Sequence, residues 1–196
     1  MSNRKARRIP TSFFYTGNPI FQLILIYFDA FQSCLKMANY FKTMDSPIGV
    51  LMLGSDEWQL KSISFDADDI GDESYIPGIL ITAEKQLEEY FSGSRKVFDL
   101  PIDPEGTEFQ KSVWEKVAGV SFGTTKSYVE IAREVKSENS SRAVGMANGK
   151  NPIPIIIPCH RIIGHNGKLT GYAGGLERKK WLLLHEQQYA LNNRLF

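Results

Sequence analysis

Residues 151–167 read NPIPIIIPCHRIIGHNG, an isoleucine-rich run set between prolines and followed at once by a cysteine and a histidine. A short run of β-branched residues is typical of a buried strand. Pro158 has no backbone N–H to donate to a sheet, so it would end the strand and release the residues after it. The sequence therefore predicts that Cys159 and His160 lie at the end of a short strand.

Cys159 is the candidate nucleophile of this stretch. A free thiol with a pKa near 8.5 is only about 3% ionised at neutral pH, so a reactive Cys159 needs help from a neighbour, first of all His160 or Arg161. Cys159 could also be a small buried apolar residue. A cysteine hydrolase stays open too, because Asn151 and Glu186 could complete its catalytic set. Metal binding has less support, since no second cysteine stands nearby.

The residues before this stretch favour three short helices, because apolar residues recur there at helical spacing. The helices are expected at 109–117, 128–135 and 142–147, the last ending at Asn148-Gly149. Two short helices joined by a turn form the outline of a helix-turn-helix, a motif that often binds DNA. Many helix pairs do not bind DNA, so a sequence-specific regulator and a protein without nucleic acid both remain possible at this point.

The N-terminal half has a different pattern. Residues 40–65 alternate between β-rich runs and turn signals, which predicts an antiparallel hairpin or meander. Apolar residues at helical spacing predict a helix over residues 79–92. Residues 98–107 contain two prolines and are interpreted as a linker.

Charge divides the chain at this linker. The whole chain of 196 residues has a net charge of +1 and is 42% hydrophobic, enough for a core in one or two small domains. Residues 37–106 hold five basic and fourteen acidic side chains, a net charge of −9, whereas residues 107–196 hold thirteen and seven, a net charge of +6. The C-terminal segment is therefore the candidate for binding a polyanion.

The first 36 residues are expected to be an extension of uncertain role. They are basic, with a net charge of +4, and include an apolar run at residues 20–31 that is shorter than the roughly 20 residues of a membrane span. Met37 resembles an ordinary domain start. The chain has only two cysteines, Cys34 and Cys159, which is too few for a disulfide framework and favours a reducing, cytoplasmic compartment.

Taken together, these motifs resemble the O6-alkylguanine-DNA alkyltransferases, also called methylated-DNA–protein-cysteine methyltransferases. The resemblance rests on five motifs in family order and spacing: Pro158-Cys159-His160-Arg161, Ala143-Val144-Gly145, residues 148–152 (NGKNP), residues 171–176 (GYAGGL) and Trp181-Leu182-Leu183. It is nearly complete over residues 107–186, weaker over 37–95 and absent over 1–36. Relatives that only bind alkylated DNA lack the cysteine, which this chain keeps.

The resemblance implies an α+β fold of two domains. The first is a ribonuclease-H-like α/β domain, expected at residues 37–103. The second is a winged helix-turn-helix domain, expected at residues 107–190, which binds DNA and carries the alkyltransferase chemistry.

The resemblance also implies a reaction. An alkyl group would pass from O6-alkylguanine, or from O4-alkylthymine, in duplex DNA to Cys159, and the thioether so formed cannot be hydrolysed, so each molecule acts once. Glu186 would orient His160, which takes the thiol proton through a water. The Tyr128 hydroxyl would support the leaving guanine. Asn151 would brace the turn that joins the recognition helix to the cysteine strand.

Two further groups of residues follow from the resemblance. The expected DNA contacts are Ser127, Arg142, Ala143, Gly145 and Asn148, and Arg142 would replace the extruded nucleotide in the base stack. The expected substrate pocket consists of Pro154, Tyr172, Ala173, Gly174 and Lys179. Ala173 stands where some members have a serine, and the small residue Gly174 and flat Pro154 suggest that groups bulkier than methyl are accepted. We expect no metal, no cofactor, no membrane and no obligate protein partner for a monomer acting on alkylated double-stranded DNA.

Overall fold

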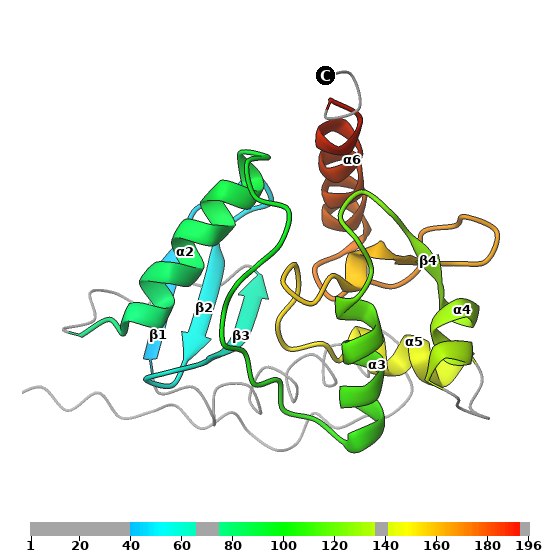
Figure 1. Cartoon of the computed structure of the whole chain (residues 1–196), viewed down its shortest axis with the longest axis horizontal. Helices are drawn as coiled ribbons and strands as arrows, with labels where there is room; N and C mark the ends of the chain where they lie inside the picture. Colours follow the sequence, from blue (N-terminus) through cyan, green and yellow to red (C-terminus); the bar gives the residue numbers. More distant parts are fainter. Residues whose placement is uncertain (1–39, 66–74, 136–140, 193–196) are drawn as a thin grey trace, which may run out of the picture.

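The computed structural model describes residues 40–65, 75–135 and 141–192, and its elements form two parts joined by an extended segment (Figure 1). The predictions for residues 1–36 lie outside the described residues. The first part comprises β1 (Tyr40–Met44), β2 (Leu51–Ser55), β3 (Leu60–Phe65) and α2 (Gly78–Phe91). The second comprises α3 (Glu108–Ala118), β4 (Lys126–Ser127), α4 (Tyr128–Glu134), α5 (Ser141–Gly149), the 3-10 turn η1 (Cys159–Arg161), β5 (Ile162–Ile163) and α6 (Leu176–Asn192).

The N-terminal part is an antiparallel sheet in the order β1-β2-β3, with α2 packed on it (Figure 1). Every residue of the central strand β2 is buried. The meander predicted over residues 40–65 and the helix predicted over 79–92 are both confirmed. Their apolar periodicity is local and was enough to identify them.

The segment predicted as a linker, residues 98–107, joins the two parts without a helix or strand, and its first half also packs on the N-terminal part. The side chain of Gln86 in α2 donates to the Asp99 carbonyl and accepts from the Asp99 N–H. Ile102 bridges to Leu60 at the edge of β3, where the Leu60 N–H donates to the carbonyl of Pro101 at 2.9 Å. The segment therefore covers the open edge of the sheet, because exposed strand edges leave backbone groups unpaired.

The C-terminal part contains the three helices predicted over residues 109–117, 128–135 and 142–147. Capping boxes start two of them, Thr107 with Gln110 at α3 and Ser127 with Glu130 at α4. The buried indole of Trp114 in α3 donates to the Ala147 carbonyl at 2.9 Å and ties α3 to α5. A two-stranded parallel sheet, β4 with β5, completes this part.

The strand predicted for the isoleucine run is wrong. Residues 152–157 form a turn in which the Ile157 N–H donates to the Ile153 carbonyl at 2.9 Å. Ile155 has a φ of 76°, in the left-handed region that a β-branched residue rarely adopts. The side chains of Ile153, Ile155 and Ile157 are buried in the core, so hydrophobicity explains the run although the backbone is not extended.

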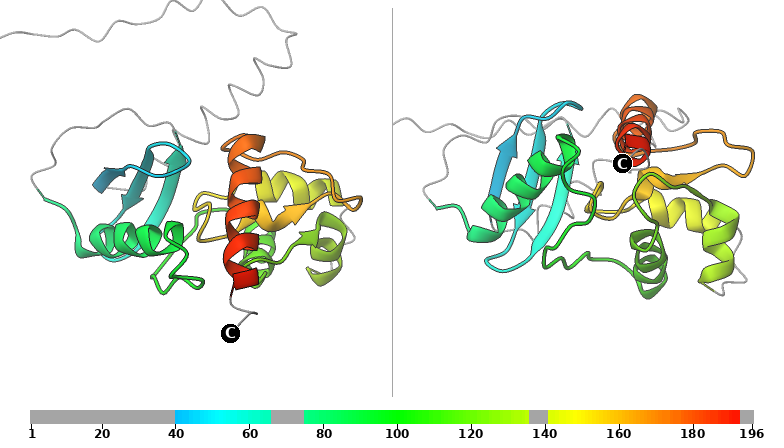
Figure 2. Two further views of the ribbon diagram at one scale, coloured as in Figure 1. Left: turned by 90° about the horizontal axis from the view of Figure 1, so that it is seen from above. Right: turned by 45° about the horizontal axis from the view of Figure 1, so that its top comes forward.

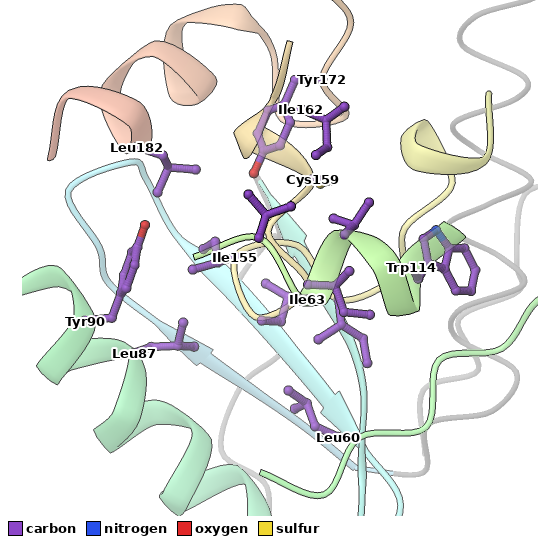
Figure 3. Packing of buried hydrophobic residues seen from close by; sticks show 14 of the residues in the cluster. Leu60, Ile63, Leu87, Tyr90, Trp114, Ile155, Cys159, Ile162, Tyr172 and Leu182 are labelled. Atoms are coloured by element: carbon purple, nitrogen blue, oxygen red, sulfur yellow. The ribbon is translucent and has the colours of Figure 1, made fainter. Parts of the chain in front are cut away.

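One hydrophobic cluster spans both parts of the molecule (Figure 3). It joins Leu60 and Leu87 of the N-terminal part to Ile155, Cys159 and Leu182 of the C-terminal part. The helix α6 runs between the two parts (Figure 2). The nucleophile candidate thus sits inside the shared core and not on an exposed loop. None of the described helices is long and apolar enough to cross a membrane.

Candidate active site

Cys159 opens the 3-10 turn η1 directly after Pro158 and is only 3% exposed. Its N–H donates to the Ile157 carbonyl at 2.7 Å, and its own carbonyl accepts from the Asn148 amide at 3.2 Å. Burial raises the pKa of the thiol to about 11, although a hydrogen bond from Asn151 and the charge of Lys179 oppose this shift. The resting thiol is therefore protonated at neutral pH, and any reaction of this sulfur as a nucleophile needs a base.

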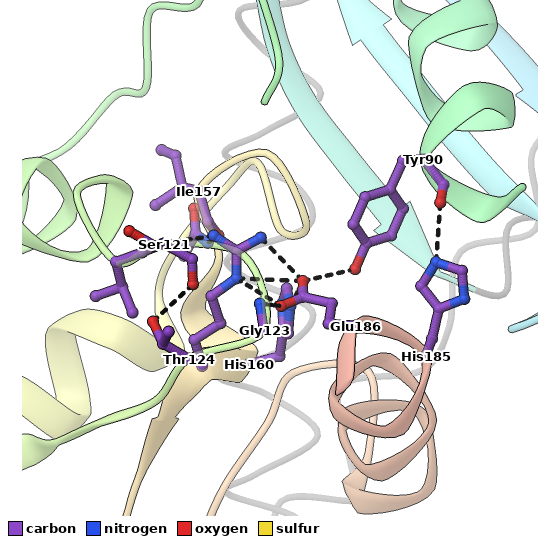
Figure 4. A network of polar contacts seen from close by, with 11 residues as sticks. Tyr90, Ser121, Gly123, Thr124, Ile157, His160, His185 and Glu186 are labelled. Carbon is purple, nitrogen blue, oxygen red and sulfur yellow. Dashed lines mark hydrogen bonds and ion pairs between the residues drawn. The ribbon is translucent and has the colours of Figure 1, made fainter. Parts of the chain in front are cut away.

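His160 and Glu186 form a buried hydrogen-bonded pair and are the candidates for a base and the group that orients it (Figure 4). Nε2 of His160 lies 2.8 Å from Oε1 of Glu186, and both side chains are fully buried. Burial disfavours the charge of Glu186, but the hydrogen bonds and charges of His160 and Arg161 outweigh burial and lower its pKa. The group is a carboxylate and can only accept, so Nε2 of His160 carries the hydrogen.

The other ring nitrogen of His160 is free to act. Burial lowers the pKa of His160 more than Glu186 raises it, so the imidazole is neutral at pH 7. Nδ1 then holds a lone pair, is buried, and has no hydrogen-bond partner among the described residues. An unpaired buried acceptor is costly and uncommon, which makes this nitrogen a candidate functional atom.

Three further groups hold Glu186, and the sequence did not single them out for this role. Arg161 donates from Nε and Nη2 at 2.9 Å each, the Gly123 N–H donates at 2.9 Å, and the Tyr90 hydroxyl donates at 2.9 Å. Gly123 has a φ of +72°, and a side chain there would collide with Ala190 of α6. Tyr90 fits the apolar spacing of its helix, although a buried tyrosine hydroxyl generally needs a partner. The expected need of its hydroxyl for a partner was the only feature of the sequence that could have pointed to a polar role for Tyr90.

Tyr128 is the first residue of α4. Burial raises the pKa of its phenol, while hydrogen bonds with Thr170 and Asn148 oppose the shift. Lys179 lies 5.8 Å from the centre of the Tyr128 ring and donates to the carbonyls of Ile162 and Thr170. Burial lowers the pKa of Lys179 to about 8. Tyr128 keeps its hydroxyl hydrogen at neutral pH and remains a donor.

Asn151 makes two hydrogen bonds inside the isoleucine turn. Its Nδ2 donates to the Ile157 carbonyl at 2.7 Å, and its Oδ1 accepts from the Ile153 N–H at 3.0 Å. These contacts lie in the segment between α5 and the cysteine where the brace was predicted, and that segment is a turn and not a strand.

The expected DNA-contacting residues separate into two groups. Arg142 is exposed on α5, and Ala143 and Gly145 are partly exposed on the same helix. Ser127 and Asn148 are buried, and both have partners inside the protein: Ser127 caps α4, and Asn148 binds the Cys159 carbonyl. Their observed roles are therefore structural in this conformation.

The expected pocket residues differ in their burial and in their contacts. Tyr172 is buried, its ring lies 5.8 Å from that of Phe65 in β3, and its hydroxyl has no hydrogen-bond partner within the described ranges. A side-chain carbon added to Gly174 would lie 2.8 Å from the Phe65 ring, so this glycine admits Phe65. Pro154 is buried in the isoleucine turn, and Ala173 is exposed.

No group of three or more His, Cys, Asp or Glu within residues 40–65, 75–135 and 141–192 is placed to hold a metal ion. The reactive groups that the described residues bring together are a thiol, an imidazole paired with a carboxylate, and a phenol.

Comparison with known proteins gives a consistent result. The family model described as 6-O-methylguanine DNA methyltransferase, DNA binding domain, matches residues 108–188, and the one described as its ribonuclease-like domain matches residues 39–104. A methylated-DNA–protein-cysteine methyltransferase from Methanosarcina acetivorans is 46% identical over 74% of this chain and 96% of its own length. A constitutive one from Bacillus subtilis is 37% identical over 80% and 99%.

Solved structures agree. The O6-methylguanine methyltransferase of Mycobacterium tuberculosis matches with a TM-score of 0.69 and 42% identity over 76% of this chain and 93% of that one. The same enzyme in complex with DNA matches equally well.

Proposed function

This chain belongs to the 6-O-methylguanine DNA methyltransferase family, and on that basis we propose that Cys159 is the residue that accepts the alkyl group. The chain is a DNA repair enzyme that transfers an alkyl group from DNA to a cysteine. The α+β fold, with a ribonuclease-like domain before a DNA-binding domain, is that of the family. The observation that carries the proposal is the buried Cys159 thiol next to the His160–Glu186 pair.

The transfer is a substitution at the alkyl carbon. The bond between sulfur and this carbon forms while the bond between the carbon and O6 of guanine breaks. The thiol proton passes through a water to Nδ1 of His160, and the Tyr128 hydroxyl donates to the departing guanine. Guanine finally gains the hydrogen that cysteine loses, so the two partners exchange an alkyl group for a proton.

Burial of the thiol suits a protein that can react only once. A protonated thiol with a pKa of about 11 is a poor target for adventitious alkylating agents. A thioether has no carbonyl for water to attack, so transfer is irreversible. Under this proposal, the thiol loses its proton to His160 only when an alkylated base is bound next to the sulfur.

DNA binding is assigned to the basic C-terminal segment. Residues 107–196 have a net charge of +6, and the exposed Arg142 lies on α5. We place Arg142 in the base stack in the position of the extruded nucleotide, whose extraction costs a few kcal/mol and less when alkylation has weakened its pairing. Duplex DNA containing O6-alkylguanine, and also O4-alkylthymine, is the proposed substrate.

Several finer features belong to the same proposal. The domain bounds 37–103 and 107–190 are supported by the two family-model matches. A monomeric state and a cytoplasmic location, the latter based on the cysteine content, remain predictions. Acceptance of groups bulkier than methyl now depends mainly on Pro154, because Phe65 fills the space beside Gly174. Failure of O6-benzylguanine to inactivate the protein would contradict the acceptance of these bulkier groups.

The test is a titration of the protein with a duplex that contains one O6-methylguanine. Restored guanine should equal the amount of protein and then stop, and Cys159→Ala should restore none. Repeated turnover would favour a cysteine hydrolase. Tight binding to a particular undamaged sequence, with no loss of methyl from DNA, would favour a regulator.

A further inference from the structure

Tyr90 connects the N-terminal domain to the proposed catalytic pair. It lies near the end of α2, is fully buried, and donates its hydroxyl hydrogen to Oε1 of Glu186 at 2.9 Å. Its backbone carbonyl accepts from Nε2 of His185 at 2.8 Å. His185 and Glu186 are consecutive residues of α6, so one turn of that helix holds Tyr90 at both ends (Figure 4).

The packing around Tyr90 requires an aromatic ring but not a hydroxyl group. The ring lies 5.4 Å from Phe91, 5.5 Å from Phe98 and 6.0 Å from Phe122, contacts that a phenylalanine would also make. Burial and the negative charge of Glu186 raise the phenol pKa well above its usual value, so the group stays a donor at any working pH. The specific contribution of the hydroxyl is therefore its hydrogen bond to the Glu186 carboxylate.

Oε1 of Glu186 is the oxygen that faces the base. It accepts from His160 Nε2 at 2.8 Å, from Arg161 Nη2 at 2.9 Å and from Tyr90 at 2.9 Å, while Oε2 accepts from the Gly123 N–H. Donors on both oxygens fix the rotation of the carboxylate. A donor on Oε1 also draws negative charge away from the hydrogen bond to His160, which makes the imidazole less basic.

We propose that Tyr90 is a positioning residue of the alkyl transfer, which acts from the N-terminal domain through Glu186 to set the orientation and basicity of His160. This inference rests on the proposed function of Cys159. It assigns the ribonuclease-like domain a part in the chemistry, since the C-terminal domain alone lacks one donor to the catalytic carboxylate.

The surroundings of His160 define how the pH dependence should change. The charged and titratable groups around it are Cys159 and Arg161 from its own turn, Glu186 and Lys179 from α6, and Tyr90 acting through Glu186 from α2. Loss of the Tyr90 hydroxyl returns charge to Oε1 and stabilises the imidazolium. The pKa of His160 then rises, and less of the neutral base is present at mildly acidic pH.

The experiment compares Tyr90→Phe with wild type in single-turnover transfer from an O6-methylguanine duplex, between about pH 5 and pH 9. We expect the rate constant to fall about tenfold and the acid limb to move to higher pH, with unchanged affinity for DNA. Tyr189→Phe is the matched control, because its ring lies 5.0 Å from His185 in the same aromatic cluster. We expect it to leave the rate and the pH profile unchanged.

A second substitution guards against a folding defect. Ring-fluorinated tyrosine at position 90 keeps the packing and donates a stronger hydrogen bond, so the acid limb should move to lower pH, opposite to Tyr90→Phe. An active wild type with unchanged rates and pH profiles in both Tyr90 variants would overturn the inference, even if their stability fell. No methyl transfer by wild type would instead overturn the proposed function.

Discussion

At the scale of single residues, the proposed reaction uses Cys159 as the nucleophile and His160 as the base. The thiol has a raised pKa because it is buried, and the imidazole has a lowered pKa for the same reason. Both are therefore neutral before the reaction. Charge develops only when the alkyl carbon is attacked, in a site where Glu186 and Arg161 already form a buried ion pair.

Tyr128 provides a test at this scale. Removal of its hydroxyl in Tyr128→Phe deprives the leaving guanine of a donor, so we expect the single-turnover rate constant to fall on the order of 10²-fold. Quenched-flow measurement with an O6-methylguanine duplex gives this constant. Tyr75→Phe, at an exposed position remote in sequence from Cys159, should transfer at the wild-type rate. Equal rates for all three proteins would exclude the proposed role of Tyr128.

The sequence predicted the local part of the site. Cys159 and His160 are neighbours in the chain, so one motif contains both. Glu186 was a candidate for the catalytic set of a cysteine hydrolase, and its role of orienting His160 followed from the family resemblance. Tyr90 was not predicted for this role, because its hydrogen bond joins residues 96 positions apart. Such a contact depends on how α2 packs against α6, which periodicity cannot reveal.

At the scale of elements, the isoleucine turn positions the nucleophile. Its strained backbone at Ile155 is held by the buried side chain of Asn151 and by the packing of the isoleucines. Composition predicted a strand here, since isoleucine favours strands wherever a partner strand exists. The helices and the meander were predictable because their patterns repeat along the chain.

Asn151 provides the test for this element. Asn151→Ala leaves the Ile153 N–H without its partner and removes one of the two donors to the Ile157 carbonyl, which keeps the Cys159 N–H. We therefore expect the free energy of unfolding to fall by about 1–3 kcal/mol. Urea unfolding measures this loss. Asn166→Ala, in an exposed turn where Oδ1 accepts from the Lys168 N–H, should change stability by less than about 0.5 kcal/mol. A similar loss in both variants would argue against the brace.

At the scale of the whole molecule, the two domains share a core and a polar network. The Ile63 N–H at the edge of β3 donates to the Pro152 carbonyl at the start of the isoleucine turn. Arg178 of α6 donates to the Ile48 carbonyl of the N-terminal part. With Tyr90 bound to Glu186, these contacts make the ribonuclease-like domain a support for the active site.

The buried pair also makes stability depend on pH. The pKa of His160 in the folded protein is lowered from 6.5. Near and below pH 6.5, this histidine is therefore protonated to a greater extent in the unfolded chain than in the folded protein. Glu186 acts in the same direction below its ordinary pKa of 4.5, because its folded pKa is lowered too. Both groups bind more protons when unfolded, so stability must fall as the pH falls.

Urea unfolding at about pH 7.5 and about pH 5.5 separates the contribution of His160. Wild type should lose stability between these values, and His160→Asn should lose distinctly less, because the variant has no imidazole to protonate. An equal loss in both proteins would show that other groups cause the acid sensitivity.

The most direct test of the central claim is to locate the transferred methyl group. The chain has two cysteines, Cys34 and Cys159, so digestion and tandem mass spectrometry after reaction with an O6-methylguanine duplex distinguish them. We predict one methyl group, on the sulfur of Cys159, in both wild type and Cys34→Ala. A methyl group on Cys34 or on any other residue, or restored guanine with an unmodified Cys159, would contradict the account.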